Sequence, residues 1–301
     1  MKLPVALTIA GSDSGGGAGI QADLKTFAAL SVHGTSAVTA VTAQNTLGVS
    51  EYAELPPGLV RAQIDDVTDD LTPTAVKTGM LASPEIIAVV AAAIEDHGIA
   101  NLVVDPVMIA KGGAKLLQDD AVEALRARLI PLATVITPNL PEAEVLLGRR
   151  ISGRDERARA ARDLVELGCR TAVVKGGHAD EDADDVVWDG HGLSWLMGTR
   201  IDTRNTHGSG CTFSAAIAAY LARGSQIEDA LLEAKAFVTG AIRHSLDVGH
   251  GHGPVNPMWQ LPGLSPAPGV PAKPASRGGK SGEYPAAPGE GGGKATSVSA
   301  D

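Results

Sequence analysis

Cysteine is nearly absent from this chain. Its 301 residues include two cysteines, Cys169 and Cys211. Two such residues provide neither a disulfide framework nor the ligand spacing of a zinc site. Free thiols are typical of reducing compartments. We therefore expect a cytoplasmic protein without structural disulfides.

Positive charge is also scarce. The formal net charge is −10 and no basic patch interrupts it, which argues against a nucleic-acid partner. No apolar run reaches the roughly 18 residues that a membrane-spanning helix needs, so we expect no membrane partner either. An acidic protein that handles anionic substrates must hold them with local groups rather than by its overall charge.

Aromatic residues make up 3% of the chain, although 44% of it is hydrophobic. The core must therefore consist of Ala, Val, Leu and Ile, a composition that suits buried parallel strands covered by helices. Composition changes near residue 262, because residues 262–301 contain 7 Pro and 9 Gly. Such a segment cannot bury enough apolar surface to offset its ordering entropy. We expect one folded domain over residues 1–260 and a disordered tail over 261–301.

Strand-like and helix-like segments alternate along residues 1–260, which indicates an α/β fold with a mostly parallel sheet. The segment 83–98 shows a helical period, with Ser83 as the N-cap, Pro84 at the first helical position and Gly98 at its end. Residues 184–202 read as a small antiparallel hairpin at the sheet edge. The expected parallel strands are 5–11, 36–43, 75–80, 101–105, 134–137 and 171–177.

Glycine-rich or polar turns follow several of these strands. Ligands of open parallel sheets bind beyond the carboxyl ends of the strands, so these turns should converge on one crevice. They span 11–19, 44–48, 105–113, 137–142 and 175–178.

One further glycine-rich turn precedes a helix in "NTHGSGCTFSAAIAAYLARG" (205–224). Unpaired N–H groups and the positive end of the helix dipole make such a turn an anion site. Cys211 lies in its first turn, beside the expected anion. The loop "GSDSGGGAGIQAD" (11–23) does not fit the dinucleotide fingerprint, but its glycines permit close approach of a ligand.

Five polar residues follow strands in the expected crevice. Gln44 carries a donor and an acceptor side by side, which matches an aminopyrimidine edge, although turn formation is the stronger explanation on sequence alone. Asp105 ends an apolar strand, where a carboxylate needs a cation or hydrogen-bond donors. Asn139 and Glu142 begin a helix, so capping is one explanation; with Asp105 they could also organise Mg²⁺ through water and phosphate oxygens. Lys175 should point into the crevice.

Taken together, the blocks resemble the hydroxymethylpyrimidine/phosphomethylpyrimidine kinases of thiamin biosynthesis, members of the ribokinase superfamily. The resemblance covers roughly residues 5–257 in the family's order. It rests on "AGSDSGGGAGIQADLKTF", "TAVTAQNT", "AVKTGML", "VVDPVM", "AKGGAKLL", "VITPNLPEAEVLLG", "VVKGGH", "NTHGSGCTFSAAIAA" and "GHGPVNP".

The resemblance implies a ribokinase-like three-layer α/β/α sandwich, a homodimer, and ATP and Mg²⁺ as cofactors. The implied reaction phosphorylates 4-amino-5-hydroxymethyl-2-methylpyrimidine to its monophosphate and then to its diphosphate. Carried over to this sequence, the pyrimidine contacts would be Gln44, Gly11, Asp23, Met80 and Val107. The implied ATP and phosphate contacts are Asn139, Ser209 and Lys175, with Asp105 and Glu142 near the metal.

Where most ribokinase-like sugar kinases have an aspartate as base, this chain has Cys211. We expect the helix N-terminus to lower the pKa of this thiol, so that Cys211 accepts or orients the acceptor's proton. The amides of Gly208, Ser209, Gly210 and Cys211 would stabilise the transferring phosphoryl group, with Lys175 assisting. Lys111 and the amides of 15–19 would hold the phosphate of the monophosphate substrate.

Two other functions remain open on the sequence. A pyridoxal kinase on the same scaffold would also bind a hydroxymethyl heteroaromatic ring, although Gln44 favours an aminopyrimidine. A regulator that binds ligands without turnover would require damage to the anion site or the acids, and both are intact.

Overall fold

The computed structural model describes residues 3–109, 113, 116–177 and 183–261, which all belong to one compact unit. Eight strands form one sheet in the order β10-β9-β8-β7-β6-β5-β1-β2. The six strands from β8 to β2 in this order are parallel to their neighbours, and β9 and β10 run antiparallel. The strands are β1 (Val5–Ala10), β2 (His33–Val38), β5 (Ala75–Thr78), β6 (Leu102–Val104), β7 (Val135–Ile136), β8 (Thr171–Val174), β9 (Asp185–Trp188) and β10 (Leu193–Leu196).

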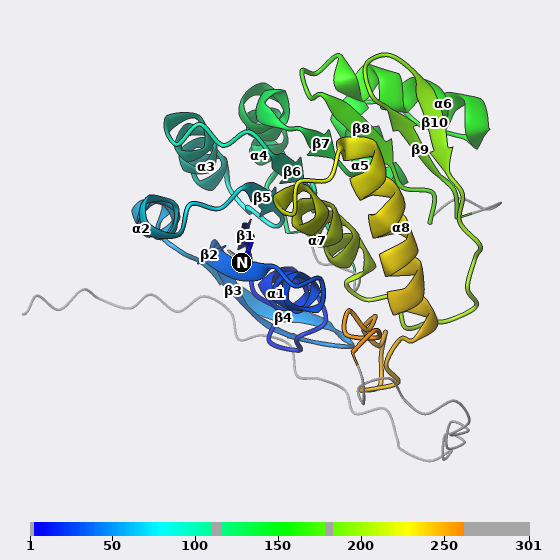
Figure 1. Ribbon diagram of the computed structural model, residues 1–301, viewed down its shortest axis with the longest axis horizontal. Coiled ribbons are helices and arrows are strands. Elements are labelled where there is room, and N and C mark those ends of the chain that lie inside the picture. The colour runs from blue at the N-terminus through cyan, green and yellow to red at the C-terminus, as the bar shows by residue number, and fades with distance from the viewer. Residues whose placement is uncertain (1–2, 110–112, 114–115, 178–182, 262–301) are drawn as a thin grey trace, which may run out of the picture. The chain divides into compact units, whose positions relative to one another are not determined.

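Helices cover both faces of this sheet (Figure 1). One face carries α1 (Gly19–Ala29), α7 (Ser209–Ala222) and α8 (Ile227–Arg243). The other carries α2 (Pro57–Leu71), α3 (Pro84–Asp96), α4 (Asp119–Ala124), the π-helix η1 (Leu125–Leu129), the 3-10 helix η2 (Ile130–Leu132), α5 (Leu140–Leu147) and α6 (Gly153–Val165). The three-layer α/β/α prediction is confirmed.

Two apolar cores explain why the strand sequences are continuously hydrophobic. Successive residues of a strand point to opposite faces. In β6, Val103 packs into the core beneath α1, α7 and α8, whereas Leu102 and Val104 pack into the core beneath α2 to α6. Both faces of the strand therefore exclude polar side chains.

The prediction of a single strand over 36–43 is wrong. The chain turns at Thr39, which is fully buried and donates from its hydroxyl to the Met80 carbonyl at 2.6 Å. Beyond this point β3 (Ala40–Asn45) leaves the main sheet and pairs with β4 (Gly48–Glu54) in a separate antiparallel hairpin. Strand β4 was not predicted, because its residues are mostly exposed and lack an apolar alternation.

The hairpin predicted within 184–202 is confirmed as β9 and β10. Within the ranges given above, no helix is both long and apolar enough to cross a lipid bilayer. The tail expected over 261–301 lies outside the described residues apart from Leu261.

Candidate active site

A pocket of about 800 Å³ lies beyond the carboxyl ends of the parallel strands. All five turns that were expected to converge contribute to its lining, which confirms that prediction. The segment 198–213 and one side of α8 add further parts of the wall.

The glycine loop after β1 is closed around the carboxylate of Asp13, which is 1% exposed. The amides of Gly15, Gly17 and Ala18 donate to its two oxygens at 2.8, 3.0 and 2.8 Å. These donors are therefore already used inside the protein. The prediction that the amides of 15–19 hold a substrate phosphate is therefore wrong for these three amides.

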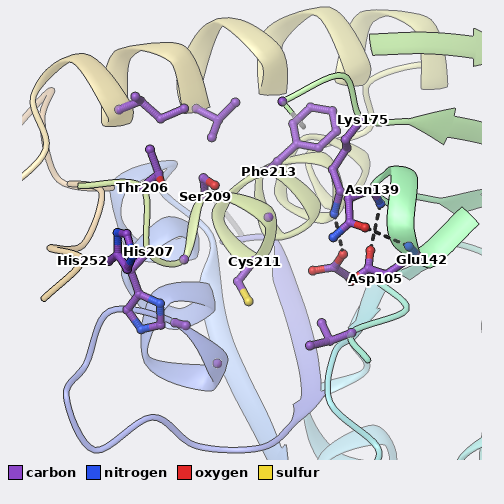
Figure 2. Close-up of a pocket in the computed structure, with 18 of the residues that line it drawn as sticks. Asp105, Asn139, Glu142, Lys175, Thr206, His207, Ser209, Cys211, Phe213 and His252 are labelled. Carbon is purple, nitrogen blue, oxygen red and sulfur yellow. Dashed lines mark hydrogen bonds and ion pairs between the residues drawn. The ribbon is translucent and has the colours of Figure 1, made fainter. Parts of the chain in front are cut away.

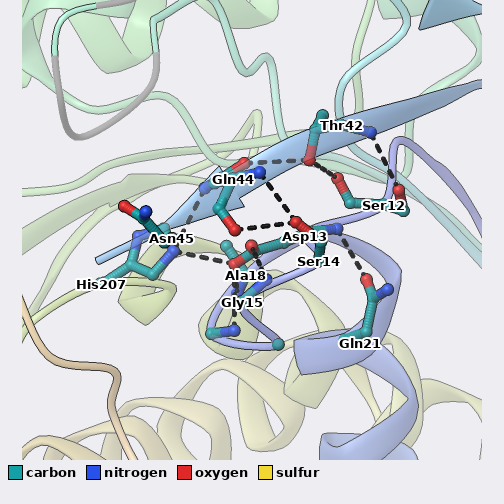
Figure 3. Close-up of polar contacts among 12 residues, drawn as sticks. Ser12, Asp13, Ser14, Gly15, Ala18, Gln21, Thr42, Gln44, Asn45 and His207 are labelled. Carbon is teal, nitrogen blue, oxygen red and sulfur yellow. Dashed lines mark hydrogen bonds and ion pairs between the residues drawn. The ribbon is translucent and has the colours of Figure 1, made fainter. Parts of the chain in front are cut away.

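Gln44 reaches the pocket from the end of β3 and is held by the same loop (Figure 3). The Ser14 hydroxyl donates to the Gln44 carbonyl and accepts from the Gln44 amide, both at 2.8 Å. His207, which sequence reasoning missed, places its Nε2 2.9 Å from Asp13 Oδ2 and 3.3 Å from the Gln44 side-chain amide. Burial acts to raise the pKa of Asp13, but the hydrogen bonds from His207 and the Ala18 amide hold it below its usual value.

The turn that follows Gln44 is fastened from its other side by the segment 249–253. The His252 amide donates to the Thr46 carbonyl at 2.9 Å, and the amides of His250 and Gly251 donate to Thr46 Oγ1 at 3.2 Å. A Cβ on Gly251 would lie 1.9 Å from the Thr46 carbonyl oxygen, so this approach requires glycine. The hairpin that carries Gln44 is thus held on both sides.

The start of α7 has the geometry on which the anion-site prediction depends. Gly208 is the N-cap residue in a left-handed conformation, with φ of 77°. A Cβ at this position would lie 1.8 Å from the Gly17 carbonyl oxygen. The Ser209 amide bonds to the Thr206 carbonyl at 3.2 Å. The amides of Gly210 and Cys211, in the first helical turn, have no acceptor within the helix and are the donors available to an anion.

The thiol of Cys211 does not have the lowered pKa that its helix position suggested. Burial is the largest effect and raises the pKa to about 11, although the positive charge of Lys77 opposes it. Asp23 and Asp105 raise it further. Burial and the two acids therefore outweigh the positive charge of Lys77. Cys211 borders the pocket in its centre (Figure 2), but as a protonated thiol.

Asp23 was expected to contact the pyrimidine, and this expectation is not met. Its carboxylate is fully buried and does not line the pocket; Oδ2 accepts from Thr8 Oγ1 at 2.6 Å and from Lys77 Nζ at 2.8 Å. Burial acts to lower the pKa of Lys77, but Asp23 and Cys211 keep it above its usual value. Asp23 can influence the site through Lys77, which borders the pocket. Sequence reasoning had assigned no role to Lys77.

Asp105 and Lys175 form an ion pair in the pocket floor (Figure 2). Lys175 Nζ lies 2.9 Å from Asp105 Oδ1, while the hydroxyls of Thr137 and Ser214 donate to the Asp105 carboxylate at 3.3 Å. Burial alone would raise the pKa of Asp105, but Lys175 and Lys77 hold it below its usual value. The carboxylate is therefore ionised.

Asn139 and Glu142 form a complete capping box at the start of α5, so the capping explanation is correct. Glu142 Oε2 accepts from the Asn139 amide at 2.8 Å, and Asn139 Oδ1 accepts from the Glu142 amide at 2.9 Å. Both residues also line the pocket. Burial raises the pKa of Glu142 to about 7; the charge of Lys175 opposes this rise and the charge of Asp105 adds to it.

These acids fit a magnesium ion held mainly through water. Glu142 is a buried acid with a raised pKa, and a divalent ion would favour its charged form. Among the residues that the structure describes, no cluster of three or more acids, histidines or cysteines could hold a metal by itself. Mg²⁺ commonly uses one or two carboxylates together with water and phosphate oxygens. Asp105 and Glu142 match that arrangement.

The predicted apolar contacts for the ring lie together. Met80 and Val107 belong to one small apolar cluster that borders the pocket. Gly11 lies against this cluster, since a Cβ there would be 3.0 Å from the Met80 sulfur. Lys111, the expected phosphate contact, falls outside the described residues.

The far end of the pocket was not predicted. Phe213, Val238 and Ile242 provide an apolar wall there. Lys235 adds a charge that is paired with Asp185 at 2.8 Å. These residues carry no local motif, since a helix that faces a pocket shows the same apolar period as a helix that faces a core.

This fold and site define a kinase that transfers a phosphoryl group to a small molecule: an anion site at a helix start, a lysine and two acids share one pocket. Comparison with known proteins supports the class and makes it specific. A family model described as phosphomethylpyrimidine kinase matches residues 13–256, and the chain belongs to that family.

Relatives and solved structures agree with this assignment. The chain is 52% identical over 258 residues to the hydroxymethylpyrimidine/phosphomethylpyrimidine kinase of Bacillus subtilis, covering 85% of this chain and 95% of that one. The structure of Bacillus subtilis pyridoxal kinase with ADP has a TM-score of 0.80 at 42% identity, covering 85% of this chain and 97% of that one. Clostridium difficile phosphomethylpyrimidine kinase has a TM-score of 0.71 at 44% identity, covering 79% and 99%.

Proposed function

We propose that the protein uses Mg·ATP to phosphorylate 4-amino-5-hydroxymethyl-2-methylpyrimidine and then its monophosphate, which yields the diphosphate. The observation that carries this proposal is the presence of Gln44 and the α7 anion site in one pocket. A ring bound to Gln44 and packed against Met80 and Val107 would face the start of α7 with its hydroxymethyl group.

The chain's own groups suit the transfer step. Phosphoryl transfer depends mainly on positioning and on neutralising charge. The amides of Gly210 and Cys211 would bind the transferring group, and Lys175 would bind phosphate oxygens of the nucleotide. Asn139 and Ser209 would add polar contacts, and Asp105 with Glu142 would accept hydrogen bonds from the water ligands of Mg²⁺. When bound, the ion would supply positive charge to the phosphate oxygens.

The substrate's proton passes to or through Cys211 in this proposal. The thiol holds its proton in the ligand-free site, because burial raises its pKa to about 11. A role as base therefore requires that substrate binding change the charge around the sulfur. A role in orienting the acceptor hydroxyl has no such requirement.

The test is ADP release by the purified protein with Mg·ATP. The hydroxymethylpyrimidine, its monophosphate and pyridoxal are offered separately. Turnover of both pyrimidines supports the proposal, whereas turnover of pyridoxal alone contradicts it. Omitting Mg²⁺ or adding a chelator tests the metal.

Pyridoxal kinase is the second candidate, favoured by the similarity to a pyridoxal kinase of known structure. Both rings carry a hydroxymethyl group, and they differ in the edge that faces Gln44. A Gln44→Ala variant separates the candidates, since it should weaken the pyrimidine more than pyridoxal.

We also propose that the protein is a cytoplasmic homodimer. The reducing compartment is supported by the unpaired thiols of Cys169 and Cys211. For the dimer, β3 and β4 expose apolar side chains on the face opposite Thr42: Val41 is 52% exposed and pairs in register with the exposed Ala53. A Val41→Asp variant places a charge in this interface and should therefore shift the protein towards the monomer. Light scattering measures that shift.

A further inference from the structure

The side-chain amide of Gln44 lies between two polar groups. One end is 3.3 Å from His207 Nε2, and the other is 3.4 Å from Thr42 Oγ1 (Figure 3). The oxygen and nitrogen of an amide occupy nearly the same space, so their hydrogen-bond partners decide which end is which.

The His207 end must be the carbonyl oxygen. Asp13 is ionised, and an ionised carboxylate can only accept hydrogen bonds. Because His207 Nε2 lies 2.9 Å from Asp13 Oδ2, that nitrogen carries a hydrogen. That nitrogen has no lone pair left to accept an N–H of Gln44, whereas a Gln44 carbonyl oxygen can share the Nε2 hydrogen with Asp13.

The Thr42 end must be the amide nitrogen. The Thr42 hydroxyl has one hydrogen and donates it to the Ser12 carbonyl at 2.8 Å. Its oxygen can then only accept from Gln44. The structure draws the amide the other way, with nitrogen towards His207 and oxygen towards Thr42. A rotation by about 180° resolves both conflicts at once, because each partner independently requires it.

We infer that Asp13, His207 and Thr42 are positioning residues that lock the Gln44 amide in one direction and so make the pocket selective for a 4-aminopyrimidine over a 4-oxopyrimidine. This inference rests on the proposed function, in which Gln44 contacts the ring. An amide offers an acceptor and a donor side by side. The 4-amino edge presents N–H beside a ring nitrogen, and the 4-oxo edge presents the reverse order, C=O beside N–H. A locked amide matches one order, whereas an amide free to rotate matches both.

The experiment compares kcat/KM for the 4-amino and 4-oxo forms of 5-hydroxymethyl-2-methylpyrimidine. The wild type should prefer the amino form by on the order of 10²-fold or more, since mismatched buried hydrogen bonds discriminate strongly. Thr42→Val and His207→Leu should reduce that preference to within about tenfold while the KM for ATP changes little. Thr42→Ser and His207→Gln, which keep the hydroxyl and an Nε2–H donor, should restore it.

Thr35→Val is the matched control. Thr35 is also a buried threonine whose hydroxyl donates to a backbone carbonyl, that of Ala6 at 3.1 Å, but it does not line the pocket. The control should keep the wild-type preference. An unchanged preference in Thr42→Val and His207→Leu would overturn the inference, as would an equal loss in Thr35→Val or a wild type that accepts both rings equally.

Nitrogen-15 NMR of the His207 ring in the ligand-free protein separates this inference from the proposed function. A hydrogen on Nε2 is expected. A ring with hydrogen on Nδ1 alone would overturn the lock even in an active pyrimidine kinase. A hydrogen on Nε2 without turnover of either pyrimidine would instead refute the proposed function and the selectivity with it, leaving the locked amide in place.

Discussion

Glu142→Gln tests the electrostatics of the pocket floor most directly. Burial raises the Glu142 pKa from 4.5 to about 7, a difference of about 2.5 units, or about 3 kcal/mol at about 1.4 kcal/mol per unit. The pKa of Glu142 is higher in the folded state than in the unfolded state, so the folded protein binds this proton more tightly. The resulting contribution to the free energy of unfolding is complete below pH 4.5 and is lost as the pH rises to about 7. Gln keeps the capping box, since its side chain can still accept from the Asn139 amide.

The variant should therefore gain stability relative to the wild type as the pH rises. The difference between their free energies of unfolding should increase by about 2–3 kcal/mol between pH 5 and pH 8. Urea unfolding followed by circular dichroism at both pH values measures this. Glu144→Gln, on the same helix but bonded to the Ile151 amide at 2.8 Å, controls for the substitution itself. A pH-independent difference between Glu142→Gln and the wild type would refute the reasoning.

Three further predictions concern the two glycine turns and the thiol. Cys211→Ala keeps the backbone amide but removes the thiol, and it should lower kcat by about 10²-fold or more; a loss well below tenfold would exclude a base role. Iodoacetamide labelling of Cys211, read by mass spectrometry, should accelerate about tenfold per pH unit from pH 7 to 9, because only the thiolate reacts. Gly208→Ala should cost at least about 10²-fold in kcat, since its Cβ would meet the Gly17 carbonyl and disturb the anion site; normal steady-state kinetics would contradict this. Asp13→Asn removes charge-assisted acceptors from three amides and should destabilise the protein by about 3 kcal/mol at pH 7, whereas equal urea midpoints for variant and wild type would not fit.

The sequence predicted the parts of the site that depend on local patterns. Short apolar runs predicted the strands, glycines predicted the turns, and the glycine-rich segment before Ser209 predicted the start of α7, where we propose an anion site. Parallel strands end on the same side of a sheet, so placing the turns together needed no further information. The capping box of Asn139 and Glu142 is likewise a pattern within four residues.

The missed residues depend on partners that lie far apart in the chain. His207 and Asp13 are separated by 194 positions, and Lys77 and Asp23 by 54. A buried lysine within "AVKTGM" shows no sign of its partner. Asp13 looks like an ordinary turn residue until the loop folds around it. The same loop shows why consecutive glycines alone do not predict a phosphate site, because their amides can be used by a neighbouring carboxylate.

The thiol shows most clearly how the surroundings override a local rule. A helix N-terminus lowers a cysteine pKa by favouring the thiolate, and the sequence offers no reason to doubt this for Cys211. In the folded protein two acids, Asp23 and Asp105, oppose the thiolate, and burial outweighs the positive charge of Lys77. Since Asp23 is paired with Lys77 and Asp105 with Lys175, the lysines are largely neutralised before any ligand binds. In the ligand-free protein Cys211 is therefore a protonated thiol at the proposed anion site. It can act as a base only after the charge around it changes.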